Sequence, residues 1–324
     1  MNDKFNGPLF IIGYPRSGTK LLRDLLNQNP NIGIPTIETN FIPKMINKYG
    51  NPPNFDKDET FDNFYKEIRK TVFWRLVNKD KIEISKKYIL DRSNRNSWSS
   101  IFETIFRYYA PENRNQGFIW GDKTPVYLDK ILFIKKIFPK AKFIHIIRDP
   151  RDCCLSERKT WGKNIFRTAE LWRKRIMKAR DDSKSIENDY TEIFYEDLIS
   201  RTELVIKELC GFISREYDVK MIRLKKPSEN LGDTKGETTI ISHNKGKYIY
   251  ELNNNEIKRI EEITYPLIKK LNYTFVNDVS FKPLNRYSLF ILKIFDGISM
   301  IKFNVSDKGF FNGIKHYYQL VKDI

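Results

Sequence analysis

Short apolar runs alternate with amphipathic segments along the first 280 or so residues of the chain. Four of the runs have the length of buried strands, and each leads through a polar loop into apolar residues at helical spacing. The predicted strands are 9–12, 118–120, 142–147 and 191–195, and the helices predicted after them are 21–26, 126–138, 150 onward and 198–212. Alternating strands and helices predict an α/β fold with a parallel sheet covered on both faces.

Between these units, further helical patterns complete the predicted organisation. Periodicity over 61–77 and 97–110 predicts a helical insertion at about 45–115, in which the polar stretch 47–60 is expected to be an exposed loop. A basic helix is predicted at 165–180 and another at 257–271, which Pro266 should kink. We therefore expect one domain over 1–278, followed by a C-terminal helical extension over 279–324.

The C-terminal extension combines apolar and basic residues. From Phe281 to Ile324 it holds seven basic and three acidic residues, and its apolar runs are too short to cross a bilayer. Apolar positions between 287 and 302 follow helical spacing, which predicts one apolar face with basic edges. Two interpretations stay open: a helix packed on the domain, or peripheral contact with an anionic membrane.

Composition narrows the classes of partner. The 324 residues include 58 Lys+Arg and 41 Asp+Glu, a net charge of +17, which favours an anionic partner such as a nucleic acid, a membrane or a phosphorylated small molecule. The segment 1–7 lacks the features of a signal peptide, and two of the three cysteines, Cys153 and Cys154, are adjacent. We expect a cytoplasmic protein, with possible contact at the inner membrane face, and no metal, because no ligand spacing is present.

The segment Gly13–Lys20 (GYPRSGTK) connects a predicted strand to a predicted helix. Such a loop offers backbone N–H groups and the positive end of a helix dipole to an anion. A nucleoside triphosphatase needs G-x-x-x-x-G-K-[ST], but here Thr19 precedes Lys20 and the cation Arg16 precedes the second glycine. The order argues against ATP or GTP hydrolysis.

A second set of anion-binding residues follows the strand 142–147. Arg148 stands at the carboxyl end of this strand and Ser156 lies two turns into the next helix, where both can reach a phosphate. Tyr195 ends a later strand, and Lys245-Gly246-Lys247 lies in the basic loop 223–246. Taken alone, these residues could also form a charged turn and a packed tyrosine.

The order P-[KR]-[ST]-G-T at residues 15–19, with an Arg and a Ser eight residues apart, resembles sulfotransferases that use 3′-phosphoadenosine 5′-phosphosulfate (PAPS). The stretch 13–26 resembles tyrosylprotein and related bacterial sulfotransferases in particular, although this chain has Lys20 where the family usually has a second Thr. The resemblance implies a single P-loop-NTPase-like domain with a central parallel sheet. It assigns donor binding to the following residues: Arg16, Ser17, Gly18, Thr19, Lys20, Arg148, Ser156 and Tyr195.

Sulfuryl transfer to a hydroxyl needs a base for the acceptor and cations for the charge that develops. The resemblance assigns the base to Glu38, and charge stabilisation to Lys123 and Arg16. Glu38 could instead cap a helix near Asn40, and Lys123 could be a surface lysine. His145, a second candidate base, lies inside an apolar strand, which favours a buried and hydrogen-bonded histidine.

The predicted function is in-line transfer of a sulfuryl group from PAPS to an acceptor hydroxyl of a glycan, a lipid-linked glycan or a tyrosine. The alternatives are a nucleotide-kinase-like phosphotransferase and a basic nucleic-acid-binding protein. Nucleic-acid binding would favour a basic stripe with stacking aromatics, whereas here the informative basic residues follow strands. No nucleic-acid partner is therefore expected, and the oligomeric state is not predicted.

Overall fold

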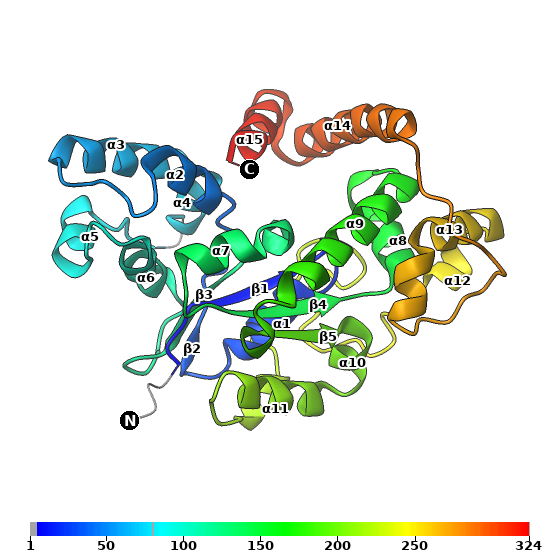
Figure 1. Cartoon of the computed structure of the whole chain (residues 1–324), viewed down its shortest axis with the longest axis horizontal. Helices are drawn as coiled ribbons and strands as arrows, with labels where there is room; N and C mark the ends of the chain where they lie inside the picture. Colours follow the sequence, from blue (N-terminus) through cyan, green and yellow to red (C-terminus); the bar gives the residue numbers. More distant parts are fainter. Residues whose placement is uncertain (1–4, 80, 324) are drawn as a thin grey trace.

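A parallel sheet forms the centre of the computed structural model, which describes residues 5–79 and 81–323 (Figure 1). Within these residues the sheet has five strands in the order β2-β3-β1-β4-β5, with every neighbouring pair parallel. The strands are β1 (Leu9–Gly13), β2 (Ile32–Gly33), β3 (Ile119–Lys123), β4 (Lys142–Ile147) and β5 (Tyr190–Phe194). The α/β prediction is confirmed, and β2, with two residues, is an addition too short to give a sequence pattern.

Side chains of the strands alternate between two hydrophobic cores. Leu9 and Ile11 of β1 pack in a core with three helices: α1 (Thr19–Leu26), α10 (Tyr195–Ser200) and α11 (Thr202–Phe212). Phe10 and Ile12 face a larger core that includes α6 (Trp98–Tyr109), α7 (Ile131–Ile137) and α9 (Ile165–Ser183). Because both faces are covered, the carboxyl edge of the sheet is the place where polar side chains can meet a ligand.

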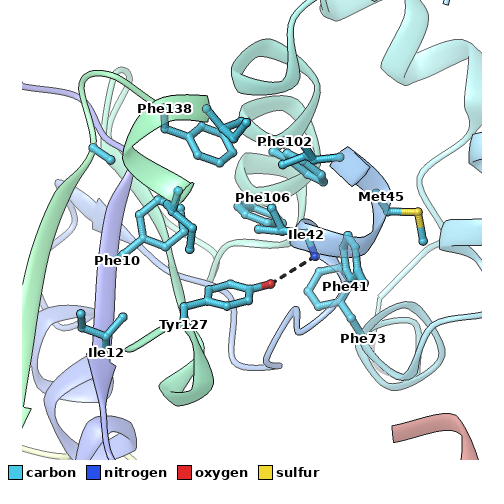
Figure 2. Close-up of a cluster of buried hydrophobic side chains, with 14 of the residues drawn as sticks. Phe10, Ile12, Phe41, Ile42, Met45, Phe73, Phe102, Phe106, Tyr127 and Phe138 are labelled. Carbon is cyan, nitrogen blue, oxygen red and sulfur yellow. Dashed lines mark hydrogen bonds between the residues drawn. The ribbon is translucent and has the colours of Figure 1, made fainter. Parts of the chain in front are cut away.

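The insertion between β2 and β3 is helical, as predicted, but two of its details differ. It contains α2 (Ile42–Tyr49), α3 (Asp58–Ile68), α4 (Val72–Val77), α5 (Lys86–Arg92) and α6. The expected exposed loop 47–60 carries Phe55, which is fully buried, and the expected helix 61–77 breaks where Thr71 caps α4. Figure 2 shows how the insertion joins the sheet: the Tyr127 hydroxyl accepts a hydrogen bond from the Ile42 backbone N–H at 3.2 Å.

The remaining helices follow β4 in the chain. They are α8 (Pro150–Trp161), α12 (Tyr248–Glu251), α13 (Asn254–Lys270), α14 (Arg286–Lys308) and α15 (Phe310–Asp323), with 3₁₀ turns at Pro125–Asp129, Glu187–Asp189 and Val219–Ile222. The single helix expected at 126–138 is a 3₁₀ turn followed by α7, and Pro266 lies inside α13. Among the described helices, none is long and apolar enough to cross a membrane.

Candidate active site

The loop between β1 and α1 is shaped to receive an anion. Gly18, the residue before α1, has a φ of +89°, and a Cβ at this position would lie 2.4 Å from the ring of Tyr195. Glycine is therefore required both for the left-handed conformation and for the close approach of Tyr195. The first-turn N–H groups of a helix have no acceptor within the helix itself. Because Gly18 has no side chain to cap them, those of α1 can bind an anion.

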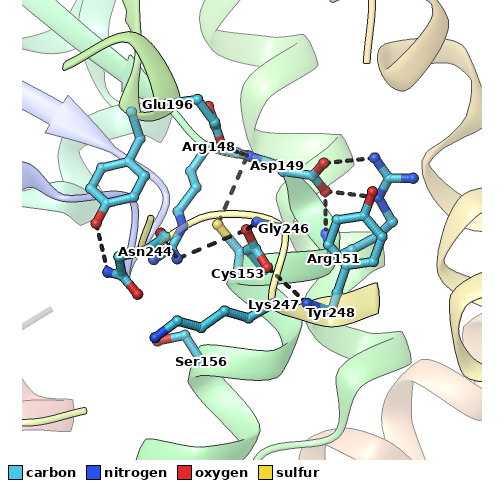
Figure 3. A network of polar contacts seen from close by, with 12 residues as sticks. Arg148, Asp149, Arg151, Cys153, Ser156, Glu196, Asn244, Gly246, Lys247 and Tyr248 are labelled. Carbon is cyan, nitrogen blue, oxygen red and sulfur yellow. Dashed lines mark hydrogen bonds and ion pairs between the residues drawn. The ribbon is translucent and has the colours of Figure 1, made fainter. Parts of the chain in front are cut away.

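The two predicted phosphate-binding motifs converge on one place. Arg16 Nε donates a hydrogen bond to Ser156 Oγ at 3.1 Å, and Arg148 donates to the Arg16 carbonyl at 3.0 Å. The Arg148 guanidinium also lies 4.4 Å from the centre of the Tyr195 ring. Residues that follow three different strands thus form one cationic site, although Arg16 and Ser156 are 140 positions apart in the sequence; Figure 3 shows part of this site.

The segment that leads into α12 closes one side of this site. Asn244 donates to the Tyr195 hydroxyl at 2.7 Å and accepts from Arg148 at 3.2 Å through its carbonyl. Asp152 of α8 accepts backbone hydrogen bonds from Gly246 (2.7 Å) and Tyr248 (3.1 Å) (Figure 3). These contacts fix the path of the chain on both sides of Lys247.

Carboxylates from the segment 228–234, which we term the acidic loop, pair with the cations of the site. Glu229 lies 3.5 Å from both Arg16 and Lys20. Asp233 lies 2.9 Å from both Lys159 and Lys247. With the acidic loop in this position, the cavity between Arg16, Arg148 and Tyr195 retains a volume of about 60 Å³.

A second cluster joins Glu38 to Lys123. Lys123 Nζ donates to Glu38 Oε1 at 2.5 Å; the lysine side chain is inaccessible, whereas 35% of the Glu38 side chain is exposed. Burial lowers the pKa of Lys123, and the charge of Glu38 acts in the opposite direction. Lys123 is the last residue of β3 and is buried, so the surface-lysine alternative is wrong.

The backbone around Glu38 is held by its neighbour. Thr39 N–H donates to Thr124 Oγ1 at 3.0 Å, and the Thr39 hydroxyl lies 2.8 Å from the Tyr127 hydroxyl. Because α2 begins at Ile42 after an N-cap at Phe41 that supplies no side-chain hydrogen bond, the helix-cap alternative for Glu38 is also wrong.

The pair Glu38 and Lys123 opens into a second cavity of about 530 Å³. Its lining combines Lys20 and Arg23 with apolar side chains, including Val72, Leu76 and Leu320. Ser228 and Glu229 line both cavities, so the acidic loop is the partition between them.

The side chain of His145 is far less accessible to solvent than that of Glu38. Its side chain has no exposed surface, and its Nδ1 lies 2.5 Å from the Tyr190 hydroxyl and 3.8 Å from Glu192. Burial lowers its pKa, and it lines neither cavity. The structure therefore places His145 as the buried, hydrogen-bonded histidine that its strand position favours.

Comparison with models of protein families shows to which family the chain belongs. A model described as "Sulfotransferase family" matches residues 8–219, which include both phosphate motifs, Glu38 and Lys123. The chain belongs to the sulfotransferase family. The match ends before the acidic loop, so the division of the chain near residue 278 stays a prediction.

Two relatives illustrate how distant the similarities of this sulfotransferase are. Protein-tyrosine sulfotransferase A of Caenorhabditis elegans is 24% identical over 225 residues, which cover 66% of this chain and 51% of that protein. Nodulation protein NoeE of Sinorhizobium fredii is 26% identical over 154 residues, which cover 47% and 31%. The chain spans about half the length, or less, of these curated relatives.

A solved structure supports the same fold. The sulfotransferase domain from the curacin biosynthetic pathway is 18% identical and superposes with a TM-score of 0.50, covering 84% of this chain and all of that domain (100%). The expected sulfotransferase fold is thereby confirmed, while the roles of individual residues remain predictions.

Two residues of the site in this sulfotransferase were not singled out from the sequence. Lys159 lies three residues after Ser156 in α8, on the same side of the helix, and this spacing could have indicated it. Asn244 precedes the Lys245-Gly246-Lys247 segment and is positioned by Tyr195 and Arg148. Such tertiary contacts leave no periodic signal.

Proposed function

We propose that this sulfotransferase binds PAPS in the cavity around Arg16 and Arg148 and transfers its sulfuryl group to a hydroxyl in the neighbouring cavity. The observation that carries this proposal is the convergence of two motifs: Arg16 of the first loop contacts Ser156 directly, and Arg148 contacts the Arg16 backbone. Among the described residues, the buried Nε of Arg148 also lacks a hydrogen-bond partner. A buried guanidinium N–H of this kind fits an anionic ligand.

The residues divide the donor between them. The first-turn amides of α1, in the segment Ser17–Lys20, and the Arg16 cation are suited to the 5′-phosphosulfate. Arg148 and Ser156 are suited to the 3′-phosphate, and Tyr195, stacked on Arg148, to the nucleoside. The donor supplies a sulfuryl group on a phosphate that can leave as adenosine 3′,5′-bisphosphate.

Glu38 takes the proton of the acceptor hydroxyl as the new S–O bond forms. The bond between sulfur and the bridging phosphate oxygen breaks, and its electron pair stays on the departing phosphate. Lys123 and Arg16 stabilise the negative charge on the transferring and leaving groups, a contribution of roughly 10²–10³-fold for one well-placed donor. Since Glu38 pairs with Lys123 through Oε1, its second carboxylate oxygen is the one assigned to the acceptor proton.

The acceptor is a hydroxyl-bearing molecule, and three classes are retained: a glycan, a lipid-linked glycan and a tyrosine side chain. The relatives include protein-tyrosine sulfotransferases and a nodulation protein. The second cavity has apolar walls beside its cations. This lining suits a hydroxyl on a partly apolar molecule.

Binding of adenosine 3′,5′-bisphosphate tests the donor site. At about 100 times its dissociation constant the ligand should add about 2.7 kcal/mol to the unfolding free energy, which a melting experiment detects. Adenosine 5′-monophosphate, which lacks the 3′-phosphate, is the matched control. Equal shifts with the two nucleotides, or none with either, would remove the donor assignment.

Glu38→Gln tests the catalytic assignment separately. The variant should bind the bisphosphate as the unmodified chain does and lose about 10²–10⁴-fold in transfer of labelled sulfate from PAPS to phenolic or glycan acceptors. Glu103→Gln, at a side chain of α6 that is 40% exposed and lines neither cavity, is the control and should keep full transfer. An active Glu38→Gln enzyme would assign the base to another group.

A further inference from the structure

The last two helices form a hairpin that bridges two parts of the molecule. α14 and α15 pack against each other, with Gly309 between them and Gly313 so close to α14 that a Cβ there would lie 2.4 Å from the Asn304 carbonyl oxygen. Figure 1 shows the hairpin passing from α8 and α9 toward the insertion helices α2–α4. Asp296 joins α14 to α9 by accepting from Asn164 N–H (2.8 Å) and pairing with Arg167 (2.6 Å).

The hairpin is also attached at its other end. Lys44 of α2 donates to the Lys322 carbonyl at 2.8 Å, and Arg75 of α4 lies 3.1 Å from His316. His316 and Leu320 of α15 line the cavity that contains Glu38 and Lys123. The hairpin is thus a wall of the proposed acceptor cavity.

The polarity of α14 is the reverse of that of an ordinary surface helix. In this fully described helix the two buried residues are Asp296 and Asn304, both polar. The exposed face instead carries a stripe of large apolar side chains at helical spacing: Tyr287, Phe290, Ile294, Ile298 and Ile301. A globular helix buries its apolar stripe and exposes its polar face. The part of the chain that the structure describes leaves this stripe uncovered.

The second helix repeats the pattern. Exposed apolar side chains follow one face of α15 at positions 310, 311, 314, 318 and 321, and Phe311 is 84% exposed. Exposed apolar side chains along both helices form a large apolar surface, and such a surface is typical of a site that binds a membrane or another molecule.

Charge indicates what covers it. On a helical wheel, Arg286, Lys293 and Lys302 lie about 90° to either side of the apolar stripe of α14. The acidic residues do not offset them, because Asp296 is buried against Arg167 and Asp307 pairs with Lys308. An apolar stripe edged by cations that form no ion pair with the described residues is the pattern of a helix lying in the surface of an anionic bilayer.

We propose that the α14–α15 hairpin docks this protein onto an anionic lipid bilayer. The apolar stripes enter the boundary between headgroups and acyl chains, and the flanking lysines and arginine contact the lipid phosphates. In combination with the proposed function, on which this consequence rests, the acceptor cavity lies at the headgroup layer. The acceptor class it favours is a hydroxyl of a lipid-linked molecule.

Vesicle flotation of the full chain tests the docking. Binding is expected to vesicles with about 30% phosphatidylglycerol in phosphatidylcholine, to be much weaker with phosphatidylcholine alone, and to fall as salt rises. The double variant Phe290→Asp and Phe311→Asp should reduce the bound fraction at least tenfold, with an unchanged melting temperature because both side chains are exposed. Ile82→Asp, at an equally exposed apolar residue outside the hairpin, should float like the unmodified chain.

Other outcomes overturn the proposal. Absence of flotation, or equal flotation of the double variant, would show that the stripes do not contact lipid. If the unmodified chain does not float and light scattering shows a dimer that the double variant dissociates, the stripes are covered by a second copy instead. Bisphosphate binding by the double variant reports on the donor site alone. It therefore distinguishes a failure of the proposed function from a failure of membrane docking.

Discussion

Replacing Glu229 by glutamine is expected to tighten the binding of adenosine 3′,5′-bisphosphate. Glu229 lies 3.5 Å from Arg16 and 3.5 Å from Lys20, two cations assigned to the donor phosphates. The free volume of about 60 Å³ is small beside the roughly 300 Å³ or more of a nucleotide-sized pocket. We therefore expect the acidic loop to move when a nucleotide enters the site, and its ion pairs oppose that movement.

The size of the effect follows from these two ion pairs. The three side chains are between 12% and 30% exposed, so each pair contributes about 0.5–1 kcal/mol after solvent screening. Losing both pairs removes about 1–2 kcal/mol from the cost of opening the loop, which corresponds to roughly a five- to thirtyfold lower dissociation constant. The difference should shrink in about 1 M salt, where the screening length falls to about 3 Å.

Titration calorimetry at low and high salt measures this difference. Glu208→Gln is the control, since it removes the same charge from an exposed position of α11 that lines neither cavity. That variant should change affinity less than twofold. Unchanged or weaker binding by Glu229→Gln, or an equal gain in both variants, would refute the idea that the acidic loop competes with the donor.

Four further substitutions test other parts of the structure. Arg16→Ala should lower turnover by about 10²-fold, whereas Arg148→Ala should weaken bisphosphate binding by about 1.5–3 kcal/mol; undiminished binding by the latter in calorimetry would contradict its assignment. Gly18→Ala should cost about 1–3 kcal/mol in urea unfolding, because its φ is +89° and its Cβ would meet the Tyr195 ring; an unchanged midpoint would contradict this. Burial raises the pKa of Asp122 to about 7, so its contribution to stability is complete below about pH 4 and is lost as pH rises through 7. Between pH 5 and pH 8 the free energy of unfolding of the unmodified chain should therefore fall by up to about 3 kcal/mol more than that of Asp122→Asn. If the two proteins showed parallel pH profiles of stability, Asp122 would not titrate in this range.

The residues that the sequence identified share a local signature. Arg148 and Ser156 could be paired because a strand end and the next helix fix their separation whatever the rest of the chain does. The partners of Glu229 and Asp233 depend instead on how the loop 223–246 returns to the sheet edge. That path is set by single contacts such as Asp152 with the Gly246 N–H, and these have no period in the sequence.

The errors have a similar cause. Phe55 is one aromatic in a polar stretch, so no repeat marked its burial between the rings of Phe64 and Trp98. The break between α3 and α4 depends on one hydrogen bond, from Trp74 N–H to the Thr71 hydroxyl, within otherwise continuous helical periodicity. Periodic patterns indicate the buried faces of long helices and strands, but they cannot indicate a single buried side chain or a single helix cap.

The acidic loop also links the occupation of one cavity to the charge in the other. Glu229 lines both, and Lys20, its partner, lines the cavity that contains Glu38 and Lys123. Under the proposed function, a donor that binds Lys20 and Arg16 would displace Glu229 and so remove a negative charge from the edge of the acceptor cavity. An acceptor that arrives first meets two carboxylates, Glu38 and Glu229, with their cations already engaged. Under the proposed function we therefore expect donor binding to favour acceptor binding, and because such coupling is reciprocal, an acceptor bound beside Lys20 would strengthen donor binding by the same factor.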